Sequence, residues 1–416
     1  MSENKAKYQM NTTENYIFLK EIREKLLWFG HNFPSPGGSA YYLGYDGAAR
    51  KELDRETWIT SRMVHVYSVA SLLNHPGSQE LADAGLKGLM GELHDKEHGG
   101  WYAGVDERGE ALPDKQCYAH AFVILAASSA VLAQRPGAQE LLKEALELYD
   151  LRFWNEEEGL SCDTWNTAFT VLDPYRGLNA NMHTVEAFLA AADVTGDEKY
   201  RKRAGRIIDH VVAWASENEW RIPEHFSKDW KIDFEYNKEH KDDQFKPYGA
   251  TPGHGIEWAR LIVQWALSAY KNNNDASSAY IEAAQNLYCT AMEDAWSTDG
   301  APGFVYTTDW SGKPIVHTRR HWTLAEAINT SAVLFRVTGK EKYANDYAEF
   351  MQYLDEKVLD HVHGSWFHRL DRKNTLAEGQ CPDKPDLYHA VQATLIPYYA
   401  ADLSIALAVK DRKVCS

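Results

Sequence analysis

The 416-residue sequence lacks the apolar segments that membrane insertion or export requires. The apolar run at residues 121–133 is shorter than the roughly 20 residues that a membrane-spanning helix needs. The first residues, Met1 to Tyr8, are polar and contain no hydrophobic segment typical of a signal peptide. We therefore expect a soluble, cytoplasmic protein without a membrane partner.

Basic residues and cysteines are also few. The 44 Lys and Arg residues stand against 60 Asp and Glu, which gives a formal net charge of -16 at pH 7. This charge repels phosphate backbones, so we expect no nucleic acid partner. The cysteines are odd in number, scattered and without a CxxC pair, which argues against a disulfide framework or zinc knuckle and favours reduced structural thiols. They are Cys117, Cys162, Cys289, Cys381 and Cys415.

No Pro/Gly/Ser-rich linker divides the chain, so we predict one domain over residues 1–416. The sequence does contain a helix start that recurs six times, at intervals of 57 to 72 residues. Each copy opens with polar or aromatic residues and runs into an apolar helix. The copies begin at Trp58, Lys115, Asn179, Thr251, Arg320 and Asp386. A near-constant period of this length indicates a repeat of helix pairs.

A charged, amphipathic helix precedes each apolar one, which completes six pairs. These outer helices are expected near residues 19–30, 80–93, 139–153, 198–216, 276–294 and 341–359. The apolar helices carry almost no charge and should therefore be enclosed. The fold class predicted is all-α: an (α/α)6 barrel of six helical hairpins. Short β-hairpins are expected in the connections at the end opposite the site, beginning near Gly99, Gly303 and Gly364.

The inner helices of such a barrel point the same way, so their first turns converge at one mouth. Helix N-termini there favour an anionic intermediate. His183, His254 and His389 occupy equivalent helix starts. A single histidine is more often structural, but three at converging positions indicate a shared site. Other histidines lack this convergence and are interpreted as structural: His65, His94, His98, His321, His361 and His363.

A metal centre is an alternative interpretation of two of these histidines. His183 and His254 are each followed three residues later by a carboxylate, Glu186 and Glu257, on the same helix face. The order is the reverse of the Glu-x-x-His pattern of di-iron bundles, and HExxH is absent. We therefore predict no metal and no cofactor, and expect Glu257 to orient His254 or to accept a sugar hydroxyl.

Several of these segments resemble the N-acylglucosamine 2-epimerase superfamily, in particular its aldose–ketose isomerase branch. The resemblance covers nearly the whole chain. It rests on the segments Trp58-Ile-Thr-Ser-Arg62, Asn179-Ala-Asn-Met-His183-x-x-Glu186, Thr251-Pro-Gly-His254-x-x-Glu257, Trp322-x-x-x-Glu326 and Asp386-Leu-Tyr-His389. It implies an (α/α)6 barrel and metal-free catalysis.

Carried over residue by residue, the resemblance implies a catalytic set and a sugar pocket. The catalytic set is His254 and His389 as the acid/base pair, His183 as the third family histidine, and Arg62 to stabilise negative charge. The pocket residues are Trp58, Tyr118, Asn179, Glu257, Trp322 and Glu326. Imidazole suits both steps of an aldose–ketose interconversion, because it acts as acid or base near neutrality.

The expected reaction opens an aldose, removes its C2 proton and returns a proton to C1 through a cis-enediolate. His389 is assigned as the base and His254 as the group that opens the ring. The sulfosugar isomerases of this branch have an arginine before Phe245 and a glutamine before Asp386. This chain has Gln244 and Pro385 there, which favours a neutral monosaccharide. Mannose to fructose is the leading substrate pair, with lyxose to xylulose as a minor reaction.

Other functions remain open at this point. A sugar 2-epimerase would share the same site. A glycoside hydrolase could use Glu257 with Glu326 or Asp386 as its carboxylate pair. A non-catalytic sugar-binding protein would not need three converging imidazoles. The long irregular segment 220–253 runs into His254 and is expected to cover the mouth as a partial lid. The oligomeric state is left undetermined.

Overall fold

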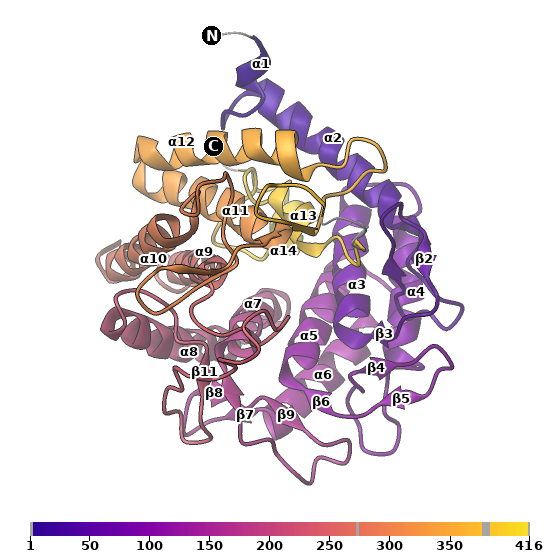
Figure 1. Cartoon of the computed structure of the whole chain (residues 1–416). Coiled ribbons are helices and arrows are strands. Elements are labelled where there is room, and N and C mark those ends of the chain that lie inside the picture. Colours follow the sequence, from indigo (N-terminus) through magenta and orange to yellow (C-terminus); the bar gives the residue numbers. More distant parts are fainter. Residues whose placement is uncertain (1–2, 272–273, 377–382, 415–416) are drawn as a thin grey trace.

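The computed structural model describes residues 3–271, 274–376 and 383–414. Six apolar helices form an inner ring, and amphipathic helices surround it (Figure 1). The inner helices are α3 (Thr57–Leu72), α5 (Cys117–Leu132), α7 (Leu178–Thr195), α9 (Pro252–Ala269), α11 (His321–Thr338) and α13 (Tyr388–Ala393). Each contacts the next, and α13 contacts α3, so the ring closes. The predicted (α/α)6 barrel is confirmed.

The outer helices pack on the inner helix that precedes them in the chain. They are α2 (Thr13–Phe29), α4 (Ser78–Met90), α6 (Ala138–Arg152), α8 (Glu198–Glu217), α10 (Asn274–Ala295) and α12 (Glu341–Tyr353). The main contacts are α3 with α4, and so on to α11 with α12, while α2 from the start of the chain packs against α13. We expected each outer helix to pack on the inner helix that follows it, and this is wrong. The first outer helix, α2, packs on the last inner helix, α13, so each later outer helix packs on the inner helix before it.

Short backbone pairings tie each helical hairpin together at the mouth. The segment entering each inner helix pairs with the segment that leaves its outer helix. The pairings are Arg55 with Val105, Lys115 with Trp165, Arg176 with Phe226, Ala250 with Thr308, and Arg319 with Leu370, and Lys384 N donates to Leu43 O at 2.9 Å. Most of these residues lie in two-residue strands. The pairings hold the six helix starts at one level.

Two of the three predicted β-hairpins form, and the third does not. β4 (Gly104–Val105) pairs with β5 (Ala111–Leu112), and β12 (Thr307–Thr308) pairs with β13 (Pro314–Val316). In the third segment, β15 (Arg369–Leu370) pairs instead with β14 (Arg319–Arg320), which precedes α11. The placement opposite the site is also wrong, because residues of the second and third segments line the site described below.

Two buried ion pairs also fix the segments that enter α5 and α13 at the mouth of the barrel. Lys115 donates to Asp95 at 2.8 Å, and Lys384 donates to Asp360 at 2.6 Å. Both lysine side chains are fully buried. Each also donates to a backbone carbonyl of the turn that follows its aspartate. Removing one partner from such a pair leaves a buried charge and costs about 3–5 kcal/mol.

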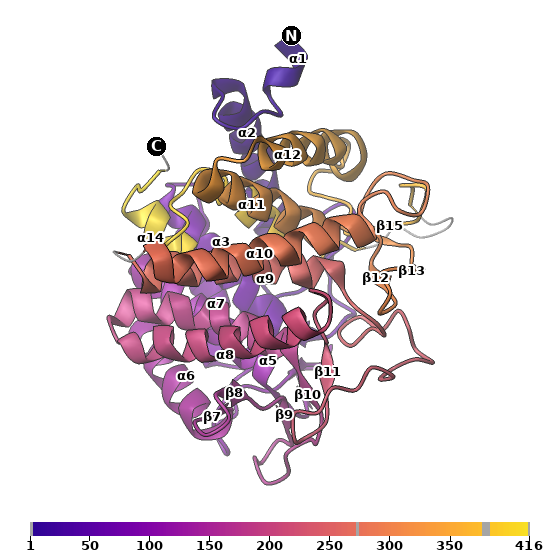
Figure 2. The same ribbon diagram turned by 90° about the vertical axis from the view of Figure 1, so that its left-hand side faces the viewer.

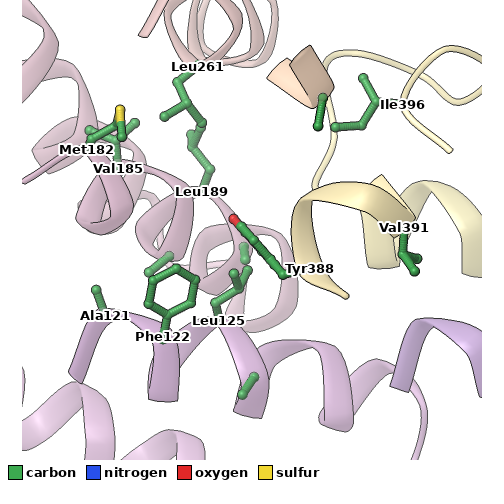
Figure 3. Close-up of a cluster of buried hydrophobic side chains, with 14 of the residues drawn as sticks. Ala121, Phe122, Leu125, Met182, Val185, Leu189, Leu261, Tyr388, Val391 and Ile396 are labelled. Carbon is green, nitrogen blue, oxygen red and sulfur yellow. The ribbon is translucent and has the colours of Figure 1, made fainter. Parts of the chain in front are cut away.

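The interior of the barrel is filled below the mouth. Figure 3 shows Tyr388 in a buried cluster that includes Phe122 and Leu125 of α5. The Tyr388 ring lies 5.3 Å from that of Phe122, in an edge-on contact. At the end opposite the strands, α14 (Ile405–Lys410) lies against α3, α5 and α7 (Figure 2). Inside the barrel, a small cavity of about 30 Å³ lies at that end, and the larger one lies at the mouth.

Cys117, Cys162 and Cys289 are free thiols, whereas Cys381 and Cys415 lie outside the described residues. Burial raises the pKa of the Cys117 thiol well above its usual value, as expected for a structural cysteine. Within the described ranges, no helix combines the length and apolar character that crossing a membrane requires.

Candidate active site

A cavity of about 320 Å³ opens where the inner helices begin. Its wall is built from one position of each helix start. In five helices this is the second helical residue, and in α9 it is the third. In chain order these residues are Trp58, Tyr118, Asn179, His254, Trp322 and His389. The sequence repeat thus places six side chains around one space.

A second layer lies one turn deeper, because residues three or four apart share a helix face. Arg62, His183 and Glu257 belong to this layer and also line the cavity. Glu326 holds the matching position on α11 but lies behind the wall, fully buried against His389. The predicted site residues are therefore brought together, with Glu326 supporting the wall rather than facing the space.

His254 is held by a carboxylate that the sequence analysis missed. Its Nδ1 lies 3.0 Å from both carboxylate oxygens of Glu224, a buried residue directly before β11 (His225–Phe226). The His254 ring stacks on Trp322 with ring centroids 5.2 Å apart. Gly253 permits this arrangement, since a Cβ there would lie 2.5 Å from the Trp322 ring. With Nδ1 engaged, Nε2 is the nitrogen of His254 that can reach a ligand.

His389 is held by Glu326, a carboxylate on the neighbouring inner helix α11. Its Nδ1 lies 3.0 Å from Glu326 Oε1, while Arg260 Nε donates to Glu326 Oε2 at 2.7 Å. Burial lowers the pKa of His389 well below its ordinary value, and the nearby Arg62 guanidinium lowers it further. The imidazole is therefore neutral at physiological pH. A neutral imidazole whose Nδ1 is bonded to a carboxylate presents Nε2 as a base.

Three carboxylates surround Arg260 at the base of the site. Glu326 lies 2.7 Å from its guanidinium, Glu186 3.7 Å and Glu257 3.8 Å. Burial, together with the charge of Glu326, raises the pKa of Glu257 well above its ordinary value. Glu257 Oε1 has no hydrogen-bond partner within the described structure. A protonated Glu257 can donate a hydrogen bond to a sugar oxygen.

The residues that could bind a metal differ from the His-x-x-Glu pairs considered in the sequence. His183 Nδ1 lies 3.8 Å from Glu186, beyond hydrogen-bond distance. Ligand atoms of Glu257, Glu326 and His389 lie within 4.8 Å of one another and could hold an ion. Glu326 already accepts from Arg260, so a cation there would compete with the guanidinium. The absence of a metal stays a prediction.

Arg62 is anchored so that its charge faces the cavity. Its guanidinium donates to Asp386 at 3.1 Å and to the Tyr118 hydroxyl at 2.9 Å. It also lies 4.7 Å from the ring centre of Trp58 and 4.5 Å from that of Phe122. A fixed cation of this kind stabilises an oxyanion without reorganisation.

His183 differs from the other two imidazoles because no carboxylate is bonded to it. Its Nδ1 has no hydrogen-bond partner among the residues that the structure describes, with Glu186 3.8 Å away, and its ring packs on Tyr118 and Phe122. Burial lowers the pKa of His183 to about 4. It is therefore neutral at physiological pH, as His389 is.

The irregular segment before α9 reaches the cavity as expected. Gln244 and Phe245 line it, and the Phe245 ring makes edge-on contacts with Trp58 and Tyr118 at 5.7 and 5.8 Å. This segment also supplies Glu224. It therefore both narrows the mouth and fixes His254.

One interpretation of the sequence is wrong. His321, taken as structural, lines the cavity, and its ring stacks on His368 with centroids 3.6 Å apart. Arg320, which opens the fifth copy of the recurring helix start, lines the same wall, as do Tyr306 and Arg369, which were not predicted. The β14–β15 pairing brings Arg369 beside Arg320 from the connection after α12, and the Tyr306 ring lies under the Arg320 guanidinium.

An (α/α)6 barrel with imidazoles, carboxylates and aromatic rings around a polar cavity at its mouth defines the class of this protein. Residues 37–393 match the N-acylglucosamine 2-epimerase (GlcNAc 2-epimerase) family. The chain belongs to this family.

Two curated relatives are similar over most of their length. A D-mannose isomerase of Thermobifida fusca is 44% identical over 88% of this chain and 89% of its own. A D-mannose isomerase of Pseudomonas cannabina pv. alisalensis is 42% identical over 85% of both chains. A crystal structure of a D-mannose isomerase superposes with a TM-score of 0.84 at 27% identity, covering 92% of this chain and 97% of that one.

Proposed function

We propose that this protein, a sugar isomerase of the N-acylglucosamine 2-epimerase family, interconverts mannose and fructose. Lyxose and xylulose are proposed as minor substrates. The observation that carries the proposal is the pair of imidazoles flanking Trp322, each with its Nδ1 on a buried carboxylate. The names of the relatives support the choice of mannose.

The first step is ring opening. His254 Nε2 transfers a proton between the anomeric hydroxyl and the ring oxygen, while Glu224 holds its imidazole in one tautomer. The flat face of Trp322 beside His254 suits the C–H surface of a sugar. The product of this step is an open-chain aldose with a free carbonyl.

The second step is proton transfer between carbons. Neutral His389 removes the C2 proton, and the electrons move to the C1 carbonyl to give a cis-enediolate. Arg62 and the first turns of the inner helices stabilise the oxyanion. A proton then passes from the C2 hydroxyl to O1, a transfer that His254 Nε2 can carry. His389 returns its own proton to C1 as the C2 carbonyl forms, which leaves the ketose. Atoms and charge balance without a cofactor.

The carboxylate geometry favours this reaction over glycoside hydrolysis. Glu326 is fully buried behind the cavity wall and does not line the space, whereas a glycosidase pair flanks the scissile bond. Glu326 is also bonded to Arg260 and His389, and Asp386 to Arg62. None of the proposed pairs leaves both carboxylates free for a glycosidic bond.

The test is a panel of aldoses incubated with the purified protein and followed by NMR. Fructose from mannose, with slower xylulose from lyxose, is the expected outcome. Glucose formed from mannose at a rate comparable with fructose would favour the 2-epimerase alternative. Cleavage of a mannoside without any ketose would favour the hydrolase.

A further inference from the structure

The helix that carries His389 is much shorter than the other inner helices. α13 has 6 residues, whereas α3, α5, α7, α9 and α11 have 16 to 18. A helix this short is marginal by itself, because few hydrogen bonds within it offset the cost of forming its first turn. The position of His389 therefore depends on side chains that fix α13 from outside.

A buried carboxylate on α7 fixes α13 at two points. Glu186 accepts hydrogen bonds from the Tyr388 hydroxyl and from Gln392 Nε2, the second at 3.3 Å. The Tyr388 side chain extends from α13 into the interior of the barrel (Figure 3). Tyr388 and Gln392 are four residues apart and lie on one face of the helix. Since His389 directly follows Tyr388, a displacement of this turn would also move the imidazole.

The same carboxylate also reaches His389 through Arg260. Glu186 Oε1 lies 3.7 Å from Arg260 Nη2. On its other side, Arg260 Nε donates to Glu326 Oε2 at 2.7 Å, and Glu326 Oε1 lies 3.0 Å from His389 Nδ1. Glu186 therefore stabilises both the helix that carries the imidazole and the arginine that holds its carboxylate partner.

The contacts of Glu186 lie away from the substrate. None of Glu186, Tyr388 and Gln392 is among the described residues that line the cavity at the mouth. Glu186 and Gln392 line instead the small cavity of about 30 Å³ at the opposite end of the barrel. Any effect of Glu186 on the reaction must therefore pass through residues that do line the site.

We propose that Glu186 is a positioning residue for His389, and that it holds α13 through Tyr388 and Gln392 so that the imidazole meets the C2 proton of the sugar. The step at C2 is that of the proposed function, on which this inference rests. Catalysis by a positioned group depends steeply on its distance from the reacting atom. A carboxylate with a purely structural role would stabilise the barrel without affecting one step of the reaction.

The kinetic test uses Tyr388→Phe and Gln392→Met, which each remove one donor to Glu186 and keep the side chain's size. Each should lower kcat about tenfold with KM for mannose unchanged, as expected when an interaction needed in the transition state is lost. With C2-deuterated mannose, the isotope effect on kcat should be at least as large as in the wild type, because the slowed step breaks the bond to C2.

Tyr149→Phe is the matched control. It removes another fully buried tyrosine hydroxyl, which contacts Thr184 of α7 and makes no contact with α13. We expect it to change neither kcat nor the isotope effect. An equal fall of kcat in Tyr149→Phe and Tyr388→Phe would overturn the proposal, because the loss would then follow from any weakened packing around α7.

A second measurement needs no turnover. In protein labelled with ¹⁵N-histidine, the ring signals of His389 are identified by NMR from their loss in His389→Ala. Tyr388→Phe and Gln392→Met should each shift these signals, whereas Tyr149→Phe should leave them in place. Unshifted His389 signals in both variants would overturn the proposal, even if the wild-type protein does not isomerise mannose. An inactive wild type with shifted signals would refute only the proposed function.

The kinetic results have two further decisive outcomes. Normal kcat in both α13 variants would overturn the role of Glu186. A lower kcat with a smaller isotope effect would also overturn it, since a step other than proton transfer from C2 would then be slowed. If Tyr388→Phe fails to fold, Gln392→Met decides the question by the same criteria.

Discussion

The two imidazole–carboxylate pairs of the site are alike in distance and different in origin. Glu224, which holds His254, comes from the irregular segment that narrows the mouth. Glu326, which holds His389, comes from the neighbouring inner helix and is shared with Arg260. One pair therefore depends on a connection and the other on the barrel.

The largest expected effect is loss of either imidazole. His389→Ala and His254→Ala should each lower kcat by about 10²-fold or more, because a positioned proton-transfer group contributes roughly 10²–10⁴. Initial rates of fructose formation provide the measurement. His361→Ala, at a side chain 60% exposed, is the matched control. Near-normal turnover in either site variant would remove that histidine from the mechanism.

Substitution of the two carboxylates should affect stability and kcat differently in the two imidazole–carboxylate pairs. Glu326→Gln leaves Arg260 without its closest buried partner and should cost about 3 kcal/mol of unfolding free energy in addition to activity. Glu224→Gln loses one charged hydrogen bond and should lower kcat about tenfold with little change in stability. Denaturant unfolding and steady-state kinetics on both variants measure the contrast. Equal loss of unfolding free energy in the two variants would show that Glu326 contributes no more to the stability of the barrel than Glu224 does.

Site residues on the inner helices could be predicted from the sequence, whereas those on the connections could not. Arg62, His183 and Glu257 were predictable because the repeat fixes the register of each helix start, and one helical turn fixes the next layer. Glu224 was not, because it lies 30 residues before His254 and is delivered by the β10 (Arg176–Gly177)–β11 pairing.

His321 shows a second limit of the sequence. It adjoins Trp322, a predicted site residue, yet adjacent residues on a helix point in different directions. Its place in the wall depends on stacking against His368, which follows α12. Helical periodicity predicts positions within one element. It says little about contacts between connections that lie far apart in the chain.

A smaller effect concerns the imidazole without a carboxylate bond. The pKa of His183 is about 4 in the folded protein and roughly 6.5 for an unperturbed imidazole. Between these values the unfolded chain binds a proton that the folded chain does not. Stability should therefore fall as pH decreases from about 6.5 to about 4, by up to about 3 kcal/mol from this residue. His183→Gln should make the dependence of Tm on pH less steep, with the rest of the slope kept by other buried histidines such as His65 and His120. An unchanged slope would contradict the assignment.

The smallest expected effect is that of chelation. Prolonged treatment with EDTA should leave kcat unchanged, because the proposed steps use only side chains of the chain. Rates before and after dialysis provide the check. Loss of activity that one divalent ion restores would instead place a cation among Glu257, Glu326 and His389.

The central claim is that His389 carries the C2 proton to C1 on one face of a cis-enediolate. It is tested most directly with C2-deuterated mannose in ordinary water, with NMR and mass spectrometry of the fructose formed at low conversion. We expect fructose with part of the deuterium at C1 and the rest lost to solvent, and glucose forming slowly if at all. Glucose appearing as fast as fructose would require a second base on the opposite face, which is incompatible with proton transfer by His389 alone.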